Sequence, residues 1–254
     1  MRNFETFAVG VVVGFLGGLF GKGGSAVATP LLSLIGYPGF IAVAAPLPAT
    51  VPGTLIASVE YWRSRLLDWQ IVWWSIGFGV PATILGSFLT KFTGARPLLI
   101  LTGFLVLGFG LLFLLSPQEH GSAPPALEEA GPRRPSYWWM RLALVATGVG
   151  LISGLLANSG GFLLAPSYAR FLSLPIKKAF ACSLAVSAML ALPGTVVHAY
   201  LGHISWSVTA YLALGSVPFS YLGARVAIHI RSSRLERLYG VALTILGAFF
   251  LFRI

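Results

Sequence analysis

Apolar runs of membrane-spanning length, repeated along almost the whole chain, are the feature that most constrains its fold. Most of these runs reach the ~20 residues that cross a bilayer as an α-helix. They occupy residues 4–20, 25–36, 41–60, 69–90, 97–115, 138–156, 162–174, 179–200, 204–228 and 238–252. Charged residues make up only 9% of the chain, against roughly 25% in a soluble domain. The sequence therefore predicts an all-α polytopic membrane protein.

The net charge of +10 does not indicate a nucleic-acid partner, because the basic residues lie in short clusters between apolar spans, which is how membrane topology is encoded. The single cysteine, Cys182, excludes an internal disulfide and a cysteine metal cluster, and we expect no cofactor. The first apolar run lacks the basic n-region and the cleavage site of a removable signal peptide. The expected environment is membrane lipid, and the chain is compatible with a homo-oligomer.

A polar, proline-rich segment divides the chain into two halves of similar pattern. Residues 116–136 read as a cytoplasmic linker, which makes 1–115 the first membrane repeat and 137–254 the second. The halves align at an offset of 136 and then 137 residues. The matched pairs are Gly14/Gly150, Gly18/Gly154, Leu19/Leu155, Gly24/Gly160, Pro30/Pro166, Pro38/Pro175, Trp69/Trp206, Pro81/Pro218 and Gly86/Gly223. A duplication accounts for these matches.

The distribution of charge indicates that the second repeat is inverted in the membrane. If 4–36 were one broken helix that crosses the membrane, the copies would be parallel and Lys and Arg would divide evenly between the two sides. If 4–20 and 25–36 instead form a hairpin that enters and leaves on one side, each half crosses an odd number of times. The basic residues then gather on the side of the linker: Arg63, Arg65, Arg133, Arg134, Arg141, Arg170, Lys177, Lys178, Arg231, Arg234 and Arg237. Only Arg2, Lys91, Arg96 and Arg253 lie on the other side, which places both termini outside.

This arrangement predicts six full spans and one glycine-tipped, re-entrant hairpin in each repeat. The arm 25–36 covers only ~18 Å of a ~30 Å hydrocarbon core. Each hairpin turns at a glycine cluster, "FGKGGS" at 20–25 and "LANSGG" at 156–161. Turn backbone is tolerated at membrane depth only where it faces protein or a polar cavity. We therefore expect the two turns to meet near the midplane, which is a typical location for the site of a transporter.

The chemistry of the two turns favours an anion. A short helix is expected to begin near Ser25 and near Gly161, so that its free N–H groups and its dipole face the site. Lys22 adds a full positive charge, while Pro30 and Pro166 are expected at or just beyond the first helical turn, where a missing N–H costs little. The predicted substrate-binding residues are Gly21, Lys22, Gly23, Gly24, Ser25, Asn158, Ser159, Gly160 and Gly161.

Two structural alternatives apply to this site. Glycine-rich turns in membrane helices often serve close helix packing alone. Lys22 can also snorkel to the membrane interface if 4–20 spans the bilayer fully. The mirrored turn at Asn158 favours a shared site over both alternatives. Bulky residues at Gly24 or Gly160 are then expected to block the approach of the amides to a substrate while leaving the protein folded.

Three further residues are candidates for coupling or for second contacts with a substrate. Glu60 is a candidate proton-coupling carboxylate, with solvated pairing to Arg63 and Arg65 as the alternative. His198 can relay protons, although a lone histidine without an equivalent in the first half is more often structural. Arg225 is a candidate second anion ligand that can equally snorkel to the cytoplasmic interface.

The duplicated turn segments resemble a known family. "GFLGGLFGKGGSAVATP" and "GLISGLLANSGGFLLAP", with the "LLDW" and "ISW" entries to the spans that follow, are similar to the TauE/SafE family of sulfite and organosulfonate exporters. The likeness covers nearly the whole chain apart from the linker. It implies a prokaryotic inner-membrane protein that exports sulfite, sulfoacetate or other organosulfonates. Alternating access would come from rocking one half against the other around the shared site.

Other function classes make different demands on the same residues. An anion channel, or a carrier for another small oxyanion or carboxylate, would use the same turns, and saturable exchange of labelled substrate separates carrier from channel. A membrane enzyme would need a nucleophile with a base, or a metal cluster. Four scattered histidines, one cysteine and no paired intramembrane carboxylates offer neither. The sequence therefore predicts a secondary transporter and not an enzyme.

Overall fold

The computed structural model describes residues 2–21, 24–92, 95–115 and 136–253, and these ranges contain helices and no strands. The elements are α1 (Arg2–Leu19), α2 (Ser25–Leu34), α3 (Gly39–Ala44), α4 (Pro46–Arg63), α5 (Trp69–Leu89), the 3-10 turn η1 (Thr90–Phe92), α6 (Ala95–Leu115), α7 (Ser136–Leu155), α8 (Gly161–Phe171), α9 (Ile176–Tyr200), α10 (Trp206–His229) and α11 (Ser232–Arg253). The chain is thus an all-helical, polytopic membrane protein. The segment 116–135, which holds nearly all of the predicted linker, lies outside the described residues.

Four helical segments in the described ranges are long and apolar enough to cross a membrane: Gly39–Arg63, Trp69–Leu89, Tyr137–Leu155 and Ile176–Tyr200. Three of them coincide with predicted full spans. The fourth belongs to α7, which the sequence predicted as a hairpin arm. With 20 residues, α7 is ~30 Å long at 1.5 Å per residue. It therefore has the length of a full span, although a short helix follows it as predicted.

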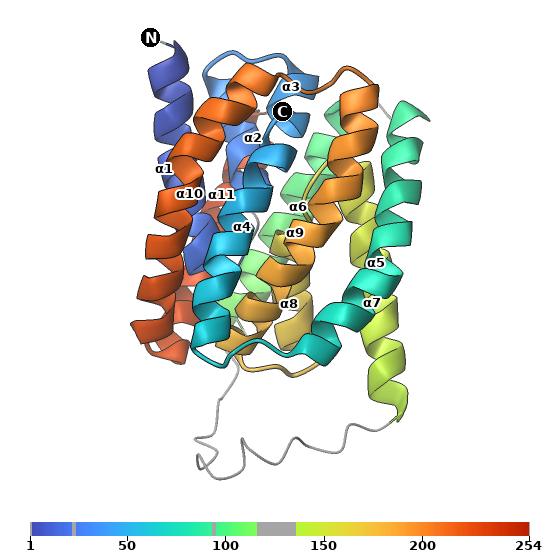
Figure 1. Cartoon of the computed structure of the whole chain (residues 1–254), viewed down its shortest axis with the longest axis vertical. Helices are drawn as coiled ribbons and strands as arrows, with labels where there is room; N and C mark the ends of the chain where they lie inside the picture. Colours follow the sequence, from blue (N-terminus) through green and yellow to red (C-terminus); the bar gives the residue numbers. More distant parts are fainter. Residues whose placement is uncertain (1, 22–23, 93–94, 116–135, 254) are drawn as a thin grey trace.

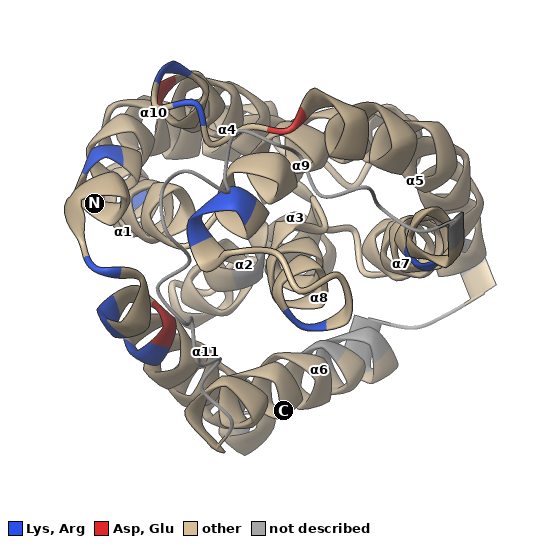
Figure 2. Cartoon of the chain, turned by 90° about the horizontal axis from the view of Figure 1, so that it is seen from below, with Lys and Arg blue, Asp and Glu red and all other residues tan. Residues whose placement is uncertain are grey.

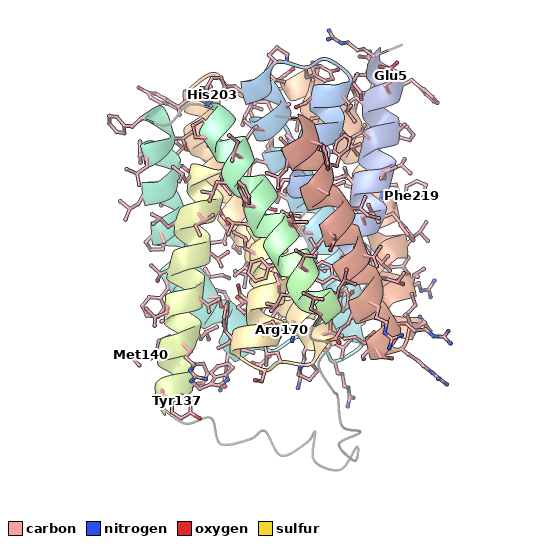
Figure 3. The ribbon with its side chains drawn as sticks, turned by 180° about the vertical axis from the view of Figure 1, so that it is seen from behind. Glu5, Tyr137, Met140, Arg170, His203 and Phe219 are labelled. Carbon is pink, nitrogen blue, oxygen red and sulfur yellow. The ribbon has the colours of Figure 1, made fainter. Side chains whose placement is uncertain are left out.

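Each half of the chain begins with a long helix followed by a short one. α2 has 10 residues and α8 has 11. Arg2 donates to the carbonyl of Gly36 (2.7 Å), so α2 returns to the end of the molecule at which α1 starts. Figure 1 shows α7 starting at the opposite end. In Figure 3, Tyr137 and Arg170, near the start of α7 and the end of α8, both lie toward that opposite end. The two helix pairs therefore enter the bundle from opposite ends.

Helix partners in the bundle follow from small residues that let backbones approach closely. α1 packs along α10, α7 packs along α5, α4 packs on α9, and α6 packs on α11. A Cβ atom added to Gly14 of α1 would lie 2.5 Å from Cα of Ser216 in α10. One added to Gly150 of α7 would lie 3.0 Å from Cα of Gly79 in α5. Both short helices are thus held by arms that are themselves tightly packed.

The prolines of the two short helices have a cost that the sequence did not predict. Pro30 and Pro166 lie inside α2 and α8, just beyond the first turn as expected. A proline there removes the hydrogen bond to the carbonyl four residues earlier. In α8 that carbonyl belongs to Phe162, and it accepts from the hydroxyl of Tyr239 in α11 at 3.5 Å. The missing N–H of Pro166 is therefore offset by a tertiary contact instead of costing little by itself.

Candidate functional site

The first turn joins α1 to α2 through glycines with left-handed backbone. Gly21 has φ +63° and Gly24 has φ +69°, a region that favours glycine over residues with a side chain. The carbonyl of Gly24 accepts from the N–H groups of Val27 and Ala28, both at 3.0 Å. These bonds begin α2 at Ser25, where the sequence predicted a new helix.

The second turn joins α7 to α8 in the same manner. Gly160 precedes α8 with φ +77°, and its N–H donates to Oδ1 of Asn158 at 3.0 Å, a local bond that asparagine often makes in turns. The carbonyl of Gly160 accepts from the N–H groups of Leu163 (3.0 Å) and Leu164 (2.9 Å). The helix therefore begins at Gly161, as predicted.

The two turns contact each other through three polar residues, Ser25, Asn158 and Ser159, which we call the turn cluster. Oγ of Ser25 donates to Oδ1 of Asn158 at 2.8 Å and lies 3.1 Å from Oγ of Ser159. The same oxygen accepts from the N–H of Ser159 at 3.2 Å. The three side chains are buried, with 1%, 6% and 1% of each residue exposed. The prediction that the turns meet agrees with these contacts.

Hydroxyl groups from neighbouring helices satisfy carbonyls at the ends of the long arms. Ser183 of α9 donates to the carbonyl of Gly21 at 2.6 Å. Thr90 of η1 donates to the carbonyl of Leu155 at 3.1 Å. The last carbonyls of a helix have no partner within it, so these bonds hold each turn in place.

The glycines that flank the turn cluster have little space for a side chain. A Cβ atom at Gly24 would lie 2.7 Å from Cγ1 of Val13, and one at Gly160 would lie 2.5 Å from Oγ of Ser153. Positive φ adds strain to any substitution there. Bulky residues at these positions should therefore disturb packing as well as any site.

A small cavity of about 10 Å³ lies beside the first turn. Its polar lining comes from α4 and α10, with Thr50, Thr54, Ser216 and Ser220 next to Gly24. A cavity of this size holds about one water molecule. A sulfur oxyanion would need the helices to move apart.

Seven of the nine predicted site residues are described. Ser25, Asn158 and Ser159 form the turn cluster, and the flanking glycines are Gly21, Gly24, Gly160 and Gly161. Lys22 and Gly23 lie outside the described residues. The structure therefore leaves the role of the predicted cation as a proposal.

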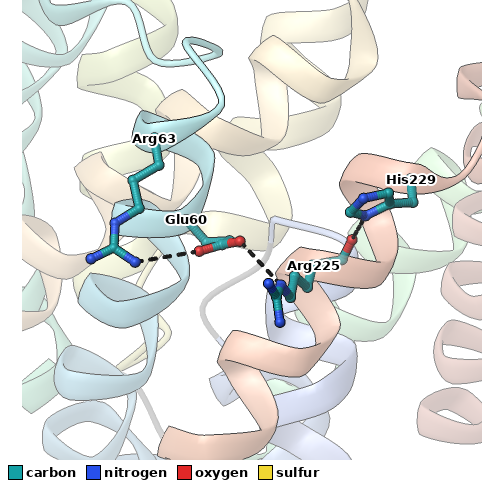
Figure 4. A network of polar contacts seen from close by, with 4 residues as sticks. All are labelled: Glu60, Arg63, Arg225 and His229. Atoms are coloured by element: carbon teal, nitrogen blue, oxygen red, sulfur yellow. Dashed lines mark hydrogen bonds and ion pairs between the residues drawn. The ribbon is translucent and has the colours of Figure 1, made fainter.

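Two of the predicted coupling residues pair with each other (Figure 4). Oε1 of Glu60 in α4 lies 3.5 Å from Nε of Arg225 in α10. The other oxygen of Glu60 lies 4.0 Å from Arg63. The side chain of Arg225 is 59% exposed and that of Glu60 is 14% exposed. Arg225, predicted as an anion ligand or a snorkelling residue, thus uses Glu60 as its partner and links the end of α4 to α10.

The prediction treated His198 as a lone histidine, but the structure pairs it. Its Nδ1 lies 3.2 Å from Nδ1 of His203, and the His203 ring stacks on Phe40 at 4.6 Å between centroids. Burial lowers the pKa of His203, which lies in the loop between α9 and α10. The available signal for this pair was the second histidine, His203, five residues after His198 in the sequence.

The sequence also missed a buried carboxylate. Glu236 of α11 is 2% exposed and interacts electrostatically with the guanidinium of Arg170, at the end of α8. Arg170 also donates to the carbonyl of Leu112 at 2.9 Å and lies 4.8 Å above the ring of Phe113. These contacts fasten the far end of α8 to α6 and α11. Glu236 belongs to a basic stretch that reads as solvated surface, whereas Arg170 lies within the apolar run 162–174.

Comparisons with known proteins identify the class of molecule. The sequence profile described as "Sulfite exporter TauE/SafE" matches residues 6–250. The chain is 28% identical to a "Probable membrane transporter protein" of Xylella fastidiosa (strain Temecula1), over 98% of this chain and 94% of that protein. It is 22% identical to the "Probable membrane transporter protein YunE" of Bacillus subtilis, over 94% and 93% of the two chains.

A third relative, a "Probable membrane transporter protein" of Haemophilus influenzae, is 25% identical over 87% of this chain and 84% of that protein. No solved structure matches the chain significantly. Within the described residues, no group of three or more His, Cys, Asp or Glu side chains is placed to hold a metal ion. Because the family profile spans nearly the whole sequence, the chain belongs to the TauE/SafE sulfite exporter family and is a membrane transporter, not an enzyme.

Proposed function

We propose that this transporter exports small sulfur-containing anions, such as sulfite and sulfoacetate, from a prokaryotic cell by alternating access around the two turns. The observation that carries the proposal is the turn cluster: Ser25, Asn158 and Ser159 bring the starts of α2 and α8 together in a buried, polar environment. Helix starts present free N–H groups and the positive end of a dipole. They are therefore suited to an oxyanion.

A sulfur oxyanion matches the number of donors at this location. A sulfite or sulfonate group carries several oxygens that accept hydrogen bonds, and N–H and O–H donors bind a charged acceptor more strongly than a neutral one. Lys22, outside the described residues, adds an ammonium three positions before Ser25 in the sequence. Replacing it, as Lys22→Met, should weaken anion binding if the ammonium faces the substrate. Unchanged binding would indicate that it snorkels to the interface.

Alternating access rests on the proposal that the two repeats are inverted copies. The packing of matched helices supports it. α7 and α10 of the second repeat correspond to α1 and α5 of the first, and α1 packs on α10 just as α7 packs on α5. The equivalent helices α4 and α9 pack on each other, as do α6 and α11. Paired repeats with broken helices are the usual basis of rocking around a central site.

The proposed orientation has the linker 116–136 in the cytoplasm and both termini outside the inner membrane. It is supported by the Lys and Arg residues that gather around the ends of α8, α10 and α11 at the end from which α7 starts (Figure 2). The positive-inside rule assigns such an end to the cytoplasm. With Cys182 replaced, single cysteines at Ser122 and Thr93 should react with an impermeant reagent from the cytoplasmic and outer faces respectively. Reaction of both from one face would reject the orientation.

The test of function uses purified protein in proteoliposomes. Vesicles loaded with unlabelled sulfite should accumulate labelled sulfite by counterflow, saturably, and sulfoacetate should compete. Phosphate and acetate serve as control anions. Flux that rises without saturation would favour a channel, and the absence of flux and of ligand-induced thermal stabilisation for either sulfur anion would refute the proposed substrate class.

A further inference from the structure

Buried hydroxyl groups without a hydrogen-bond partner gather around the second turn. Among the described residues, Ser87 of α5, Ser153 of α7 and Ser187 of α9 each have such a hydroxyl, and all three residues are 0% exposed. A buried polar group without a partner is costly and uncommon in native proteins. Three on neighbouring helices indicate that something else supplies their hydrogen bonds.

Ser153 points at the start of α8. Its Oγ lies 2.5 Å from the position that a Cβ atom of Gly160 would take, and Gly160 directly precedes the helix. Leu190 of α9 also borders this position, with Cδ1 at 3.2 Å. Ser187 lies three residues before Leu190 on α9, so the two share a helix face. Ser187 therefore lies about one helical turn from Leu190, on the face of α9 that meets Gly160.

Ser87 closes the group from α5. A Cβ atom at Gly154, next to Ser153, would lie 2.7 Å from the backbone nitrogen of Ser87. One at Gly194 of α9 would lie 3.9 Å from Oγ of Ser87. The hydroxyl of Ser87 thus lies between α7 and α9. We call Ser87, Ser153 and Ser187 the serine set of the second turn.

The ligand suited to this group is an anion. Hydroxyl groups can donate, and Ser153 lies beside the start of α8, where the first N–H groups and the positive end of the helix dipole are exposed. A set of donors at a helix start favours an oxyanion over a cation.

The turn cluster itself has less capacity to bind. Ser25 already bonds to both Asn158 and Ser159, and Oδ1 of Asn158 also accepts from Gly160. An anion placed there would have to break these bonds. The serine set of the second turn, by contrast, can form hydrogen bonds to an anion without breaking existing ones.

In the described part of the chain, the first turn has no equivalent of this group. The residue that corresponds to Ser153 at the offset of 136 is Gly17. The residue that corresponds to Ser187 at the offset of 137 is Thr50, whose hydroxyl donates to the carbonyl of Leu47 at 2.8 Å. The serine set is therefore a property of the second turn and is not repeated at the first.

We propose that Ser153 and Ser187, with Ser87, form the anion-binding pocket of this transporter at the start of α8, and that the turn cluster is the adjoining tie between the hairpins. The pocket takes a small sulfur oxyanion, so this inference rests on the proposed function. The inference differs from the proposed function in two respects. It assigns the binding residues to α5, α7 and α9, and it makes the site asymmetric between the two turns.

The test measures sulfite and sulfoacetate binding to the purified full-length protein and to the variants Ser153→Ala, Ser187→Ala and the double variant. Hydrogen bonds to a charged group are strong enough that each single variant should raise the dissociation constant about tenfold or more. The melting temperature without ligand should stay equal or rise, because an unsatisfied buried hydroxyl is removed.

Ser58→Ala is the matched control. Ser58 of α4 also has a buried hydroxyl without a partner, but it lines an apolar groove of about 410 Å³ between α4, α5 and α9. This variant should bind both anions like the wild type. Wild-type affinity in the double variant would overturn the pocket while leaving the proposed function intact. The same conclusion would follow if Ser58→Ala lost as much affinity as the double variant. Wild-type protein that binds neither anion would count against the proposed function itself.

Discussion

The substitution Ser25→Ala removes the hydroxyl through which the two hairpins meet. That hydroxyl donates to Asn158 Oδ1 at 2.8 Å and accepts from the N–H of Ser159 at 3.2 Å. It also lies 3.1 Å from the hydroxyl of Ser159. It is thus a direct link from α2 to the second turn. The consequence for stability can be worked out bond by bond.

The loss has two parts. Asn158 Oδ1 keeps its bond from the N–H of Gly160, so its lost bond costs about 0.5–1.5 kcal/mol. The N–H of Ser159 loses its bond to Oγ of Ser25, which also costs about 0.5–1.5 kcal/mol. Together the two losses should lower the free energy of unfolding by roughly 1–3 kcal/mol. In a chain of this length, that lowers the melting temperature by roughly 2–12 °C.

The assay is thermal unfolding of the purified variant in detergent, beside Ser33→Ala. Ser33 lies on the same helix, but its hydroxyl donates to the carbonyl of Thr29 at 3.0 Å, within that helix, so its removal should change stability by less than about 0.5 kcal/mol. A double-mutant cycle of Ser25→Ala with Ser159→Ala should give a coupling energy of about 0.5–3 kcal/mol. Equal melting temperatures for Ser25→Ala and Ser33→Ala would refute the reasoning, because the contact would then contribute no stability.

Three further outcomes follow from the geometry. Gly160→Ala should have a melting temperature well below that of Gly148→Ala. The added Cβ would lie 2.5 Å from Oγ of Ser153 at position 160 but would meet open space at position 148. Equal melting temperatures would contradict this. Burial lowers the pKa of His203, so the folded state resists its protonation and stability should fall as pH drops below about 6.5; His203→Gln should reduce that fall in a pH series of melting curves. Glu60→Gln should cost less than about 1 kcal/mol in thermal unfolding, because its ion pair involves a mostly exposed arginine.

The sequence was sufficient to predict the turns because the signal is local and appears twice. Glycines in two matched segments of apolar helix predict breaks, and the polar residues Ser25 and Asn158 next to them need partners at that depth. The structure supplies each with the other at 2.8 Å. Helix starts at Ser25 and Gly161 follow from the same glycines.

Contacts between helices distant in the sequence were not predictable in the same way. In the sequence, Ser153 and Ser187 look like the many serines that bond to a carbonyl of their own helix, and only the structure shows that their hydroxyls lack such a partner. Glu236 sits in "RSSRLERLYG", which reads as a solvated helix start, yet it is buried beside α8.

A site built from hydroxyls and helix ends suits outward transport in the proposed orientation. An inside-negative potential favours the exit of a monovalent anion by ~2.3 kcal/mol per 100 mV, which corresponds to a ratio of roughly fifty in concentration. A carrier with that driving force needs no second ion, but it must release its substrate readily. The donors proposed for the pocket, Ser153 and Ser187, are neutral, so release of the anion would not leave an unpaired charge on them. Transport by this protein should therefore respond to the membrane potential even at equal pH on both sides, and sulfite efflux from proteoliposomes under a potassium diffusion potential measures it. Efflux that requires a pH gradient and ignores the potential would show that a proton is coupled, with Glu236 as the buried carboxylate to examine first.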